Sequence, residues 1–196
     1  MPSASLAEVG VGLFSAYEAA CFARPVLTKA ATSGVAYVLG DVLAQRLAPA
    51  KFNLARVVRS GAAGCLSHGP QLHYWSLFLD RFVCLPGPAT YTVACKILLD
   101  QTIFSLYLNG AYCALTELLK RSSASATWAR MKASAWPMLS SSWRFWPAVH
   151  ALTYSIVPTH LRVLWVDIVE VVWVAILSTC AVRAANANKD PHPHAE

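Results

Sequence analysis

Residues 60–79 contain no Asp, Glu, Lys or Arg, and this uncharged run constrains the fold more than any other feature of the chain. About 20 consecutive apolar residues are the length of a helix that crosses a bilayer. Other apolar stretches have a similar length, and one of them is rich in Trp and contains Pro137 and Pro147, which break or kink a helix. The apolar stretches are residues 26–43, 60–79, 91–119, 133–157 and 161–182.

The composition agrees with a membrane protein. Hydrophobic residues make up 56% of the 196 residues and charged residues 13%, whereas a soluble domain carries about 25% charged residues. So few charged side chains cannot cover a soluble globule, and a chain this apolar is not intrinsically disordered. None of the stretches alternates with the period of two that a membrane barrel requires. We predict an all-α integral membrane bundle of about four spanning helices, in which 133–157 is either a kinked span or a helix at the membrane surface.

The two ends of the chain are predicted separately from this bundle. Apolar residues at helical spacing from Leu6 to Cys21 predict an amphipathic N-terminal helix that lies at the membrane surface. The first residues show no secretory signal or Arg-rich transit pattern, and the last residues are polar. We divide the chain into an N-terminal segment (1–16), a single helical membrane domain (17–182) and a polar C-terminal tail (183–196).

Basic residues are concentrated in two connectors. Segments 42–79 and 118–166 contain no acidic residue, and their Lys and Arg side chains gather at 46–59 and 120–132. Connectors rich in Lys and Arg stay on the cytosolic or matrix side of a membrane, so we expect both on one side. The net charge of +6 is not gathered among polar and stacking residues, and we expect no contact with nucleic acid.

The predicted spans contain polar side chains that a simple membrane anchor avoids. A charged residue at the bilayer centre costs about 3 kcal/mol, so such residues pair or face water. Two interpretations stay open: the residues tie helices together as buried pairs, or they line a polar route for ions or solutes. Lys96 and Asp100 share a helix face, which predicts an intrahelical pair. The candidate pore or polar-core residues are Lys29, Asp41, Lys96, Asp100, Gln101, Asp167 and Glu170.

Small residues recur at positions where helices can approach closely. In the stretch 26–43, every fourth residue from Thr28 to Gly40 is small, and these residues form one stripe on a helix. Gly61 and Gly64 lie in the stretch 60–79. In lipid, small residues allow the close packing that drives helix association. We therefore predict helix contacts at these positions.

The sequence carries no recognisable catalytic or metal site. It lacks the GxSxG, HExxH, GxxxxGK[ST] and GxGxxG patterns, and its six cysteines form no CxxC pair. His68 and His73 are five residues apart, whereas two metal ligands on one helix face are four apart. We expect no enzymatic activity, no cofactor and no metal.

Four motifs, in order along the chain, resemble those of a known family. They are an opening motif from Tyr17 to Gln45, a GP-x-x-H-x-W element, a K-x-x-x-DQ element and a C-terminal signature rich in Trp and Pro. Over residues 17–180 the chain resembles the family of the Mpv-seventeen protein and the peroxisomal membrane protein of twenty-two kilodaltons. The motif residues that the resemblance implies to be structural are Pro25, Gly40, Gly69, Pro70, His73, Trp75, Trp143, Trp146, Pro147, Pro158, Arg162 and Trp173.

The resemblance also implies a location and a function. Members of this family are small proteins of the mitochondrial inner membrane or the peroxisome, with about four spans and channel-like permeability. We expect this chain in the mitochondrial inner membrane first and the peroxisomal membrane second. We expect a weakly selective channel or solute-permeability protein, and the alternative is a non-conducting scaffold that binds lipids or partners. Besides the lipid bilayer, its candidate partners are ions, small metabolites and further copies of the chain.

The chain departs from the family pattern, mostly where the family has an amide. Losing amides removes groups that form interhelical hydrogen bonds, although we expect the fold to survive. The departing residues are Ser76, Leu106, Ser142, His150, Thr153, Tyr154 and Val174.

Overall fold

The computed structural model describes residues 6–48 and 51–187, with side chains for 7–48 and 51–175. Throughout this part of the chain the secondary structure is helical, which confirms the all-α prediction. The predicted polar tail from 183 lies mostly outside the described residues. The elements are α1 (Leu6–Ala23), α2 (Pro25–Leu47), α3 (Leu54–Ala63), η1 (Gly64–His68), α4 (Gly69–Phe82), α5 (Ala89–Leu99), η2 (Asp100–Phe104), α6 (Ser105–Leu119), α7 (Ala124–Ser142), α8 (Trp146–Ser155) and α9 (Arg162–Ala187).

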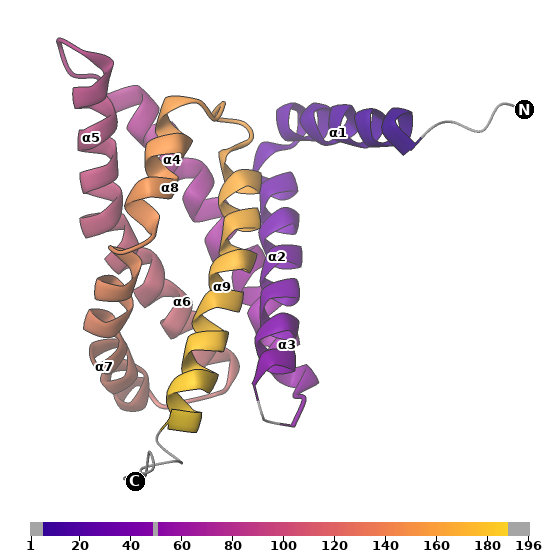
Figure 1. Cartoon of the computed structure of the whole chain (residues 1–196), viewed down its shortest axis with the longest axis vertical. Helices are drawn as coiled ribbons and strands as arrows, with labels where there is room; N and C mark the ends of the chain where they lie inside the picture. Colours follow the sequence, from indigo (N-terminus) through magenta and orange to yellow (C-terminus); the bar gives the residue numbers. More distant parts are fainter. Residues whose placement is uncertain (1–5, 49–50, 188–196) are drawn as a thin grey trace, which may run out of the picture.

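After α1, the described helices form five columns that run alongside one another (Figure 1). The columns are α2, then α3 with η1 and α4, then α5 with η2 and α6, then α7 with α8, and finally α9. Helix α2 packs against α9, α3, η1 and α4, whereas α6 packs against α7 and α5 against α8. The stretch 133–157 therefore belongs to a kinked column beside its neighbours.

Helix length is sufficient for a bilayer in several columns. At about 1.5 Å per residue, the 23 residues of α2 and the 26 residues of α9 extend over about 34 and 39 Å, against about 30 Å of hydrocarbon. Among the described residues, α2 is the one helix that is both long and apolar enough to cross a membrane by length and composition. The count of about four spans stays a prediction.

Two columns contain a π-helical turn, η1 and η2, that the sequence did not predict. The N–H of Gly69 bonds to the carbonyl of Gly64, and the N–H of Ser105 bonds to that of Asp100. Each turn accommodates an extra residue, and the second column stays helical from η1 through Gly69 and Pro70 into α4. Such turns often mark functional sites.

The second basic connector is shorter than predicted. Helix α6 ends at Leu119 and α7 begins at Ala124, where the side chain of Ser123 accepts a hydrogen bond from the N–H of Ala126. The residues after this cap include Ala, Arg, Met and Lys, which form helices well even without an apolar run. The connections α2–α3 and α6–α7 both lie at the lower end of the bundle in Figure 1.

Helix α1 extends sideways from the upper end of α2 (Figure 1). The predicted helix is confirmed, but its one-sided character is not. Val9 and Val11 are both exposed, although two positions apart on a helix they face nearly opposite directions. The apolar residues of α1 are therefore spread around the helix.

The bundle has a polar interior and an apolar exterior. Lys29, Lys96, Asp100 and Asp167 are buried, together with several His and Ser side chains. Large apolar side chains, by contrast, are exposed along nearly every column. A water-soluble protein has the opposite arrangement, whereas in a bilayer an apolar exterior is favourable and polar side chains face the interior.

Candidate functional site

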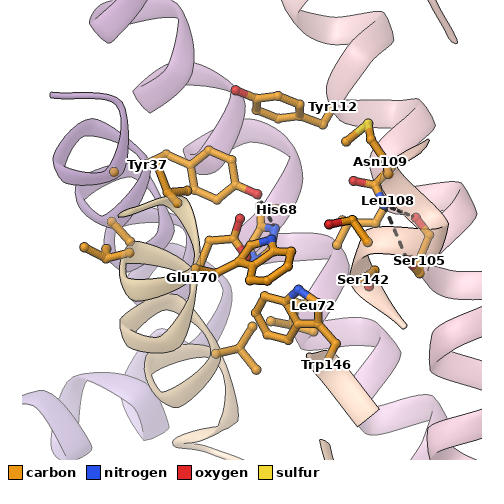
Figure 2. A pocket seen from close by; sticks show the side chains of 18 of the residues that line it. Tyr37, His68, Leu72, Ser105, Leu108, Asn109, Tyr112, Ser142, Trp146 and Glu170 are labelled. Atoms are coloured by element: carbon orange, nitrogen blue, oxygen red, sulfur yellow. Dashed lines mark hydrogen bonds between the residues drawn. The ribbon is translucent and has the colours of Figure 1, made fainter. Parts of the chain in front are cut away.

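All five columns contribute to one internal cavity of about 290 Å³. One wall carries Tyr37 from α2, His68 from η1 and Glu170 from α9, and the facing wall carries Ser105 and Asn109 from α6 (Figure 2). Four of the seven predicted pore or polar-core residues line the cavity, while Lys29, Lys96 and Asp167 are not among its lining residues. The four are Asp41, Asp100, Gln101 and Glu170.

Asp41 forms the cavity wall together with its ion partner. Nε of Arg56 lies 2.7 Å from Oδ1 of Asp41, and the side chain of Gln45 donates to Oδ2 at 2.6 Å. The same Gln45 accepts from the N–H of Asn53, which joins the end of α2 to the start of α3. Because Arg56 neutralises Asp41, this pair adds little net charge to the cavity.

Asp100 is fully engaged by donors from three columns. Its Oδ1 accepts from the indole N–H of Trp75 at 2.8 Å and from the hydroxyl of Tyr154 at 2.7 Å. Its Oδ2 lies 2.9 Å from Nε2 of His150 and accepts from the Gln101 amide. Asp100 therefore ties helices together, and the predicted pair with Lys96 is wrong.

Lys96 instead pairs with Asp80, a residue that the sequence analysis did not select. The carboxylate of Asp80 also accepts from Arg162 and from the hydroxyl of Thr159. This Asp80 cluster (Asp80, Lys96, Thr159 and Arg162) joins α4, α5 and the start of α9. Asp80 lies directly after the apolar stretch 60–79, where an ion pair can remain partly hydrated.

Lys29 and Asp167 are buried between the columns. Nζ of Lys29, whose residue is 2% exposed, donates to Nδ1 of His73 at 2.8 Å. Oδ2 of Asp167, which is 1% exposed, accepts from the hydroxyl of Ser33 at 2.7 Å, and Oδ1 lies 3.5 Å from Nε2 of His68. Lys29 of α2 therefore meets α4, Asp167 of α9 meets α2 and η1, and neither residue lines the cavity.

An apolar cluster closes the cavity toward the Asp80 cluster. The buried members of this cluster are Leu72, Phe104, Trp146, Val149, Val163 and Val166. Leu72, Phe104, Trp146 and Val166 also line the cavity. Along α9 the order is Arg162, then Val163 and Val166, then Glu170, so the apolar cluster separates the two polar regions.

The proline and glycine residues of the family motifs shape the columns. Pro25 and Pro147 lie in the first turns of α2 and α8, where a missing N–H has little cost, whereas Pro70 follows the π turn η1 within a continuous helical column. Pro158 lies in the turn before α9, where its carbonyl accepts from the N–H of Leu161.

Close packing at glycine is confirmed between α2 and the second column. A Cβ at Gly64 would lie 2.6 Å from the carbonyl oxygen of Ser33, and one at Gly69 would lie 2.5 Å from that of Lys29. Gly40 faces Val174 of α9 at ordinary contact distance.

The tryptophan residues of the C-terminal signature surround the cavity. Trp146 and Trp173 line it, and the indole N–H of Trp143 donates to the carbonyl of Gln101 at 2.9 Å. This last bond fixes the break between α7 and α8 against η2.

Several lining residues carry no formal charge and were not predicted from the sequence. Ser105, Asn109 and Tyr112 line the cavity from α6, at positions i, i+4 and i+7 of one helix face. This polar stripe within an apolar helix was the available signal. Tyr37 had no comparable signal, because a single Tyr in an apolar stretch looks like a packing residue.

The departures from the family pattern still form interhelical hydrogen bonds. Ser142 donates to Gln101, and Thr153 accepts from the indole N–H of Trp165. His150 and Tyr154 both bind Asp100. Hydroxyl and imidazole groups therefore supply polar contacts at four of the departing positions. In the part of the chain that is described, no three His, Cys, Asp or Glu side chains are placed to hold a metal ion.

The polar interior, apolar exterior and shared cavity define an all-helical protein with the organisation of a membrane bundle. The pattern of the Mpv17 / PMP22 family matches residues 117–178. The chain is 31% identical to "Mitochondrial inner membrane protein Mpv17" of Homo sapiens over 88% of this chain and 99% of that protein. It is 30% identical to "Peroxisomal membrane protein 2" of Bos taurus (79% and 82%) and 29% identical to "Protein sym-1" of Neurospora crassa (85% and 97%). No solved structure matches the chain. The chain belongs to the Mpv17 / PMP22 family.

Proposed function

We propose that the chain is a multi-pass protein of an organelle membrane and acts as a weakly selective channel or solute-permeability protein. The observation that carries this proposal is the cavity, which all five columns line inside an apolar exterior. Its relatives are named for the mitochondrial inner membrane and the peroxisomal membrane, and we place the chain in the first of these membranes before the second. About four of these columns cross the bilayer, with the kinked α7–α8 column packed against α5 and α6.

The size and lining of the cavity favour small polar solutes. Its volume of about 290 Å³ lies near the lower limit of about 300 Å³ for ligand pockets. Ser105, Asn109 and Tyr112 offer hydrogen bonds to many solutes. Among the described residues, Glu170 is the lining carboxylate that has no side-chain hydrogen bond or ion pair, so it sets the charge preference. A cavity lining of this kind favours weak selectivity among solutes, with a preference for cations.

The alternative is a scaffold that binds lipids or partners and conducts nothing. The apolar cluster that closes the cavity toward the Asp80 cluster is compatible with this alternative, because a static bundle would have the same closure. Neither the channel nor the scaffold requires enzymatic activity, and we propose none.

Conductance of the purified protein in planar bilayers tests the proposal. The informative variant is Glu170→Gln, because Asp41 and Asp100 are held by other side chains and their substitution also disturbs the fold. We expect reproducible conductance from the wild type and a lower cation preference from Glu170→Gln. The matched control is Glu8→Gln, which makes the same change on α1, outside the cavity. Silence from folded wild-type protein would favour the scaffold, and an equal change in both variants would remove Glu170 from the pathway.

A further inference from the structure

A line of hydrogen-bonding side chains continues from the cavity past the apolar cluster. Tyr37, Ser33 and Lys29 lie four residues apart on one face of α2. Each meets a partner from another column: His68 for Tyr37, Asp167 for Ser33, and His73 for Lys29. The line therefore advances by four residues, about 6 Å along α2, at each step.

The first step starts at the cavity surface. Tyr37 and His68 both line the cavity, and the hydroxyl of Tyr37 lies 2.8 Å from Nδ1 of His68 (Figure 2). If the hydroxyl donates to Nδ1, the neutral imidazole carries its proton on Nε2. That Nε2–H faces Oδ1 of Asp167.

The second step contains two unsatisfied atoms. Within the described residues, Nε2 of His68 and Oδ1 of Asp167 are buried and form no hydrogen bond, although they lie 3.5 Å apart. A buried polar atom without a partner is costly, and a gap of this size closes with a small movement or a bridging water. The groups that face Asp167 are Ser33 from α2 and His68 from η1, and Glu170 lies one turn further along α9.

We propose that this line, the α2 relay (Tyr37, His68, Asp167, Ser33, Lys29 and His73), conducts protons between the cavity and the α1 end of the bundle. The inference rests on the proposed function, since it requires a membrane bundle whose cavity holds water. Chains of Asp, His and similar side chains inside membranes serve as proton relays in many transporters.

The transfer balances one proton at each step. A hydronium ion in the cavity gives a proton to the oxygen of Tyr37 and becomes water, while the original hydroxyl proton moves to Nδ1 of His68. The imidazole then gives its Nε2 proton to Oδ1 of Asp167, which leaves a neutral imidazole in the opposite tautomer and a neutral carboxyl. Water beside Ser33 takes this proton, which restores the Asp167 carboxylate, and passes it to Nε2 of His73, whose Nδ1 receives the hydrogen bond of Lys29. The His73 imidazolium releases the proton to water at the α1 end of the bundle, and a flip of the neutral His68 ring restores its starting hydrogen bonds.

Proton flux and solute flux in the same vesicles test the relay. The full-length protein is reconstituted in vesicles of phosphatidylcholine and cardiolipin, and proton uptake driven by a valinomycin potassium potential is read with an internal pH dye. Efflux of a small neutral sugar alcohol is measured in parallel. We expect Asp167→Asn to reduce proton uptake by about tenfold or more with sugar-alcohol efflux retained. The control Glu8→Gln removes a carboxyl on α1, outside both the cavity and the α2 relay, and should leave proton uptake unchanged.

A second variant, His68→Gln, tests the relay in case Asp167→Asn does not fold. His68→Gln retains an amide near Tyr37 but has no imidazole to exchange tautomers, so it should also lose proton uptake selectively. The relay is refuted if the wild type takes up no protons, if both relay variants conduct protons like the wild type, or if proton uptake follows solute efflux in every variant. Absence of solute efflux from the wild type refutes the proposed function, whereas normal efflux with unaltered proton uptake in both variants refutes the relay alone.

Discussion

Nζ of Lys96 lies 2.6 Å from Oδ1 of Asp80, a residue of a different column, although Asp100 is one helical turn away from Lys96 on its own column. Both oxygens of Asp80 also accept from Arg162 at 2.9 Å. One carboxylate thus joins α4, α5 and α9. The interaction is long-range, and helical spacing alone could not identify it.

The Asp80 cluster should stabilise the fold. In Asp80→Asn the amide no longer balances the charges of Lys96 and Arg162, which are both buried. Unpaired charges of this kind cost about 1–3 kcal/mol or more. We expect a lower thermal unfolding temperature in detergent. Lys96→Gln should lower the unfolding temperature less in the Asp80→Asn background than in the wild type. Equal decreases in the two backgrounds would show that Lys96 and Asp80 are not energetically coupled.

Acid should weaken the same cluster over a defined pH range. Burial by itself raises the pKa of Asp80, but hydrogen bonds from Lys96, Thr159 and Arg162 outweigh it and lower the pKa from 3.8 to about 2. A carboxyl whose pKa is lower in the folded chain stabilises the fold above its unfolded pKa and loses this effect as the pH falls through the folded value. The difference in unfolding temperature between wild type and Asp80→Asn should therefore be constant above about pH 4 and shrink toward pH 2. A difference that widens on acidification would contradict this assignment.

Asp100 should act on stability more than on ion preference. Its oxygens accept from Trp75 and Tyr154 and contact His150. Asp100→Asn replaces one acceptor oxygen by a donor, so one of these donors loses its partner, at a cost of about 1–3 kcal/mol. We expect a lower unfolding temperature and, in protein that remains folded, a smaller change in cation preference than in Glu170→Gln. The opposite order, with Asp100→Asn changing selectivity more, would make Asp100 a lining charge of the conducting path.

The helices and several cavity residues could be predicted because their signals are local. Apolar stretches identified the columns, and the cost of burying charge pointed to Asp41, Asp100, Gln101 and Glu170. The partners could not be predicted, because pairs such as Asp80 with Arg162 depend on which columns are neighbours.

The two π turns were missed for a related reason. Each adds one residue to a helical turn and so shifts the register between the helices on its two sides, and His68 and Asp100 within these turns are buried. Composition does not record this change of register. The short connector before α7 was missed because the prediction relied on apolar runs, and the first turns of α7 have none.

Close packing at Gly64 should be essential, and Gly10 provides the matched control. A Cβ at Gly64 would lie 2.6 Å from the carbonyl oxygen of Ser33 and 2.8 Å from Cγ of Tyr37, so α2 must move away from η1 in Gly64→Ala. Overpacking costs about 1–3 kcal/mol, and here the nearest neighbour is backbone that cannot rotate aside. Gly10 is also helical but has no atom within 4 Å of its Cβ position, so Gly10→Ala should be neutral or stabilising by up to about 1 kcal/mol. Thermal unfolding in detergent compares the two variants directly. Equal unfolding temperatures would mean that α2 and η1 are further apart than the structure places them, and the alignment of Ser33 and Tyr37 with their partners in the α2 relay would then fail as well.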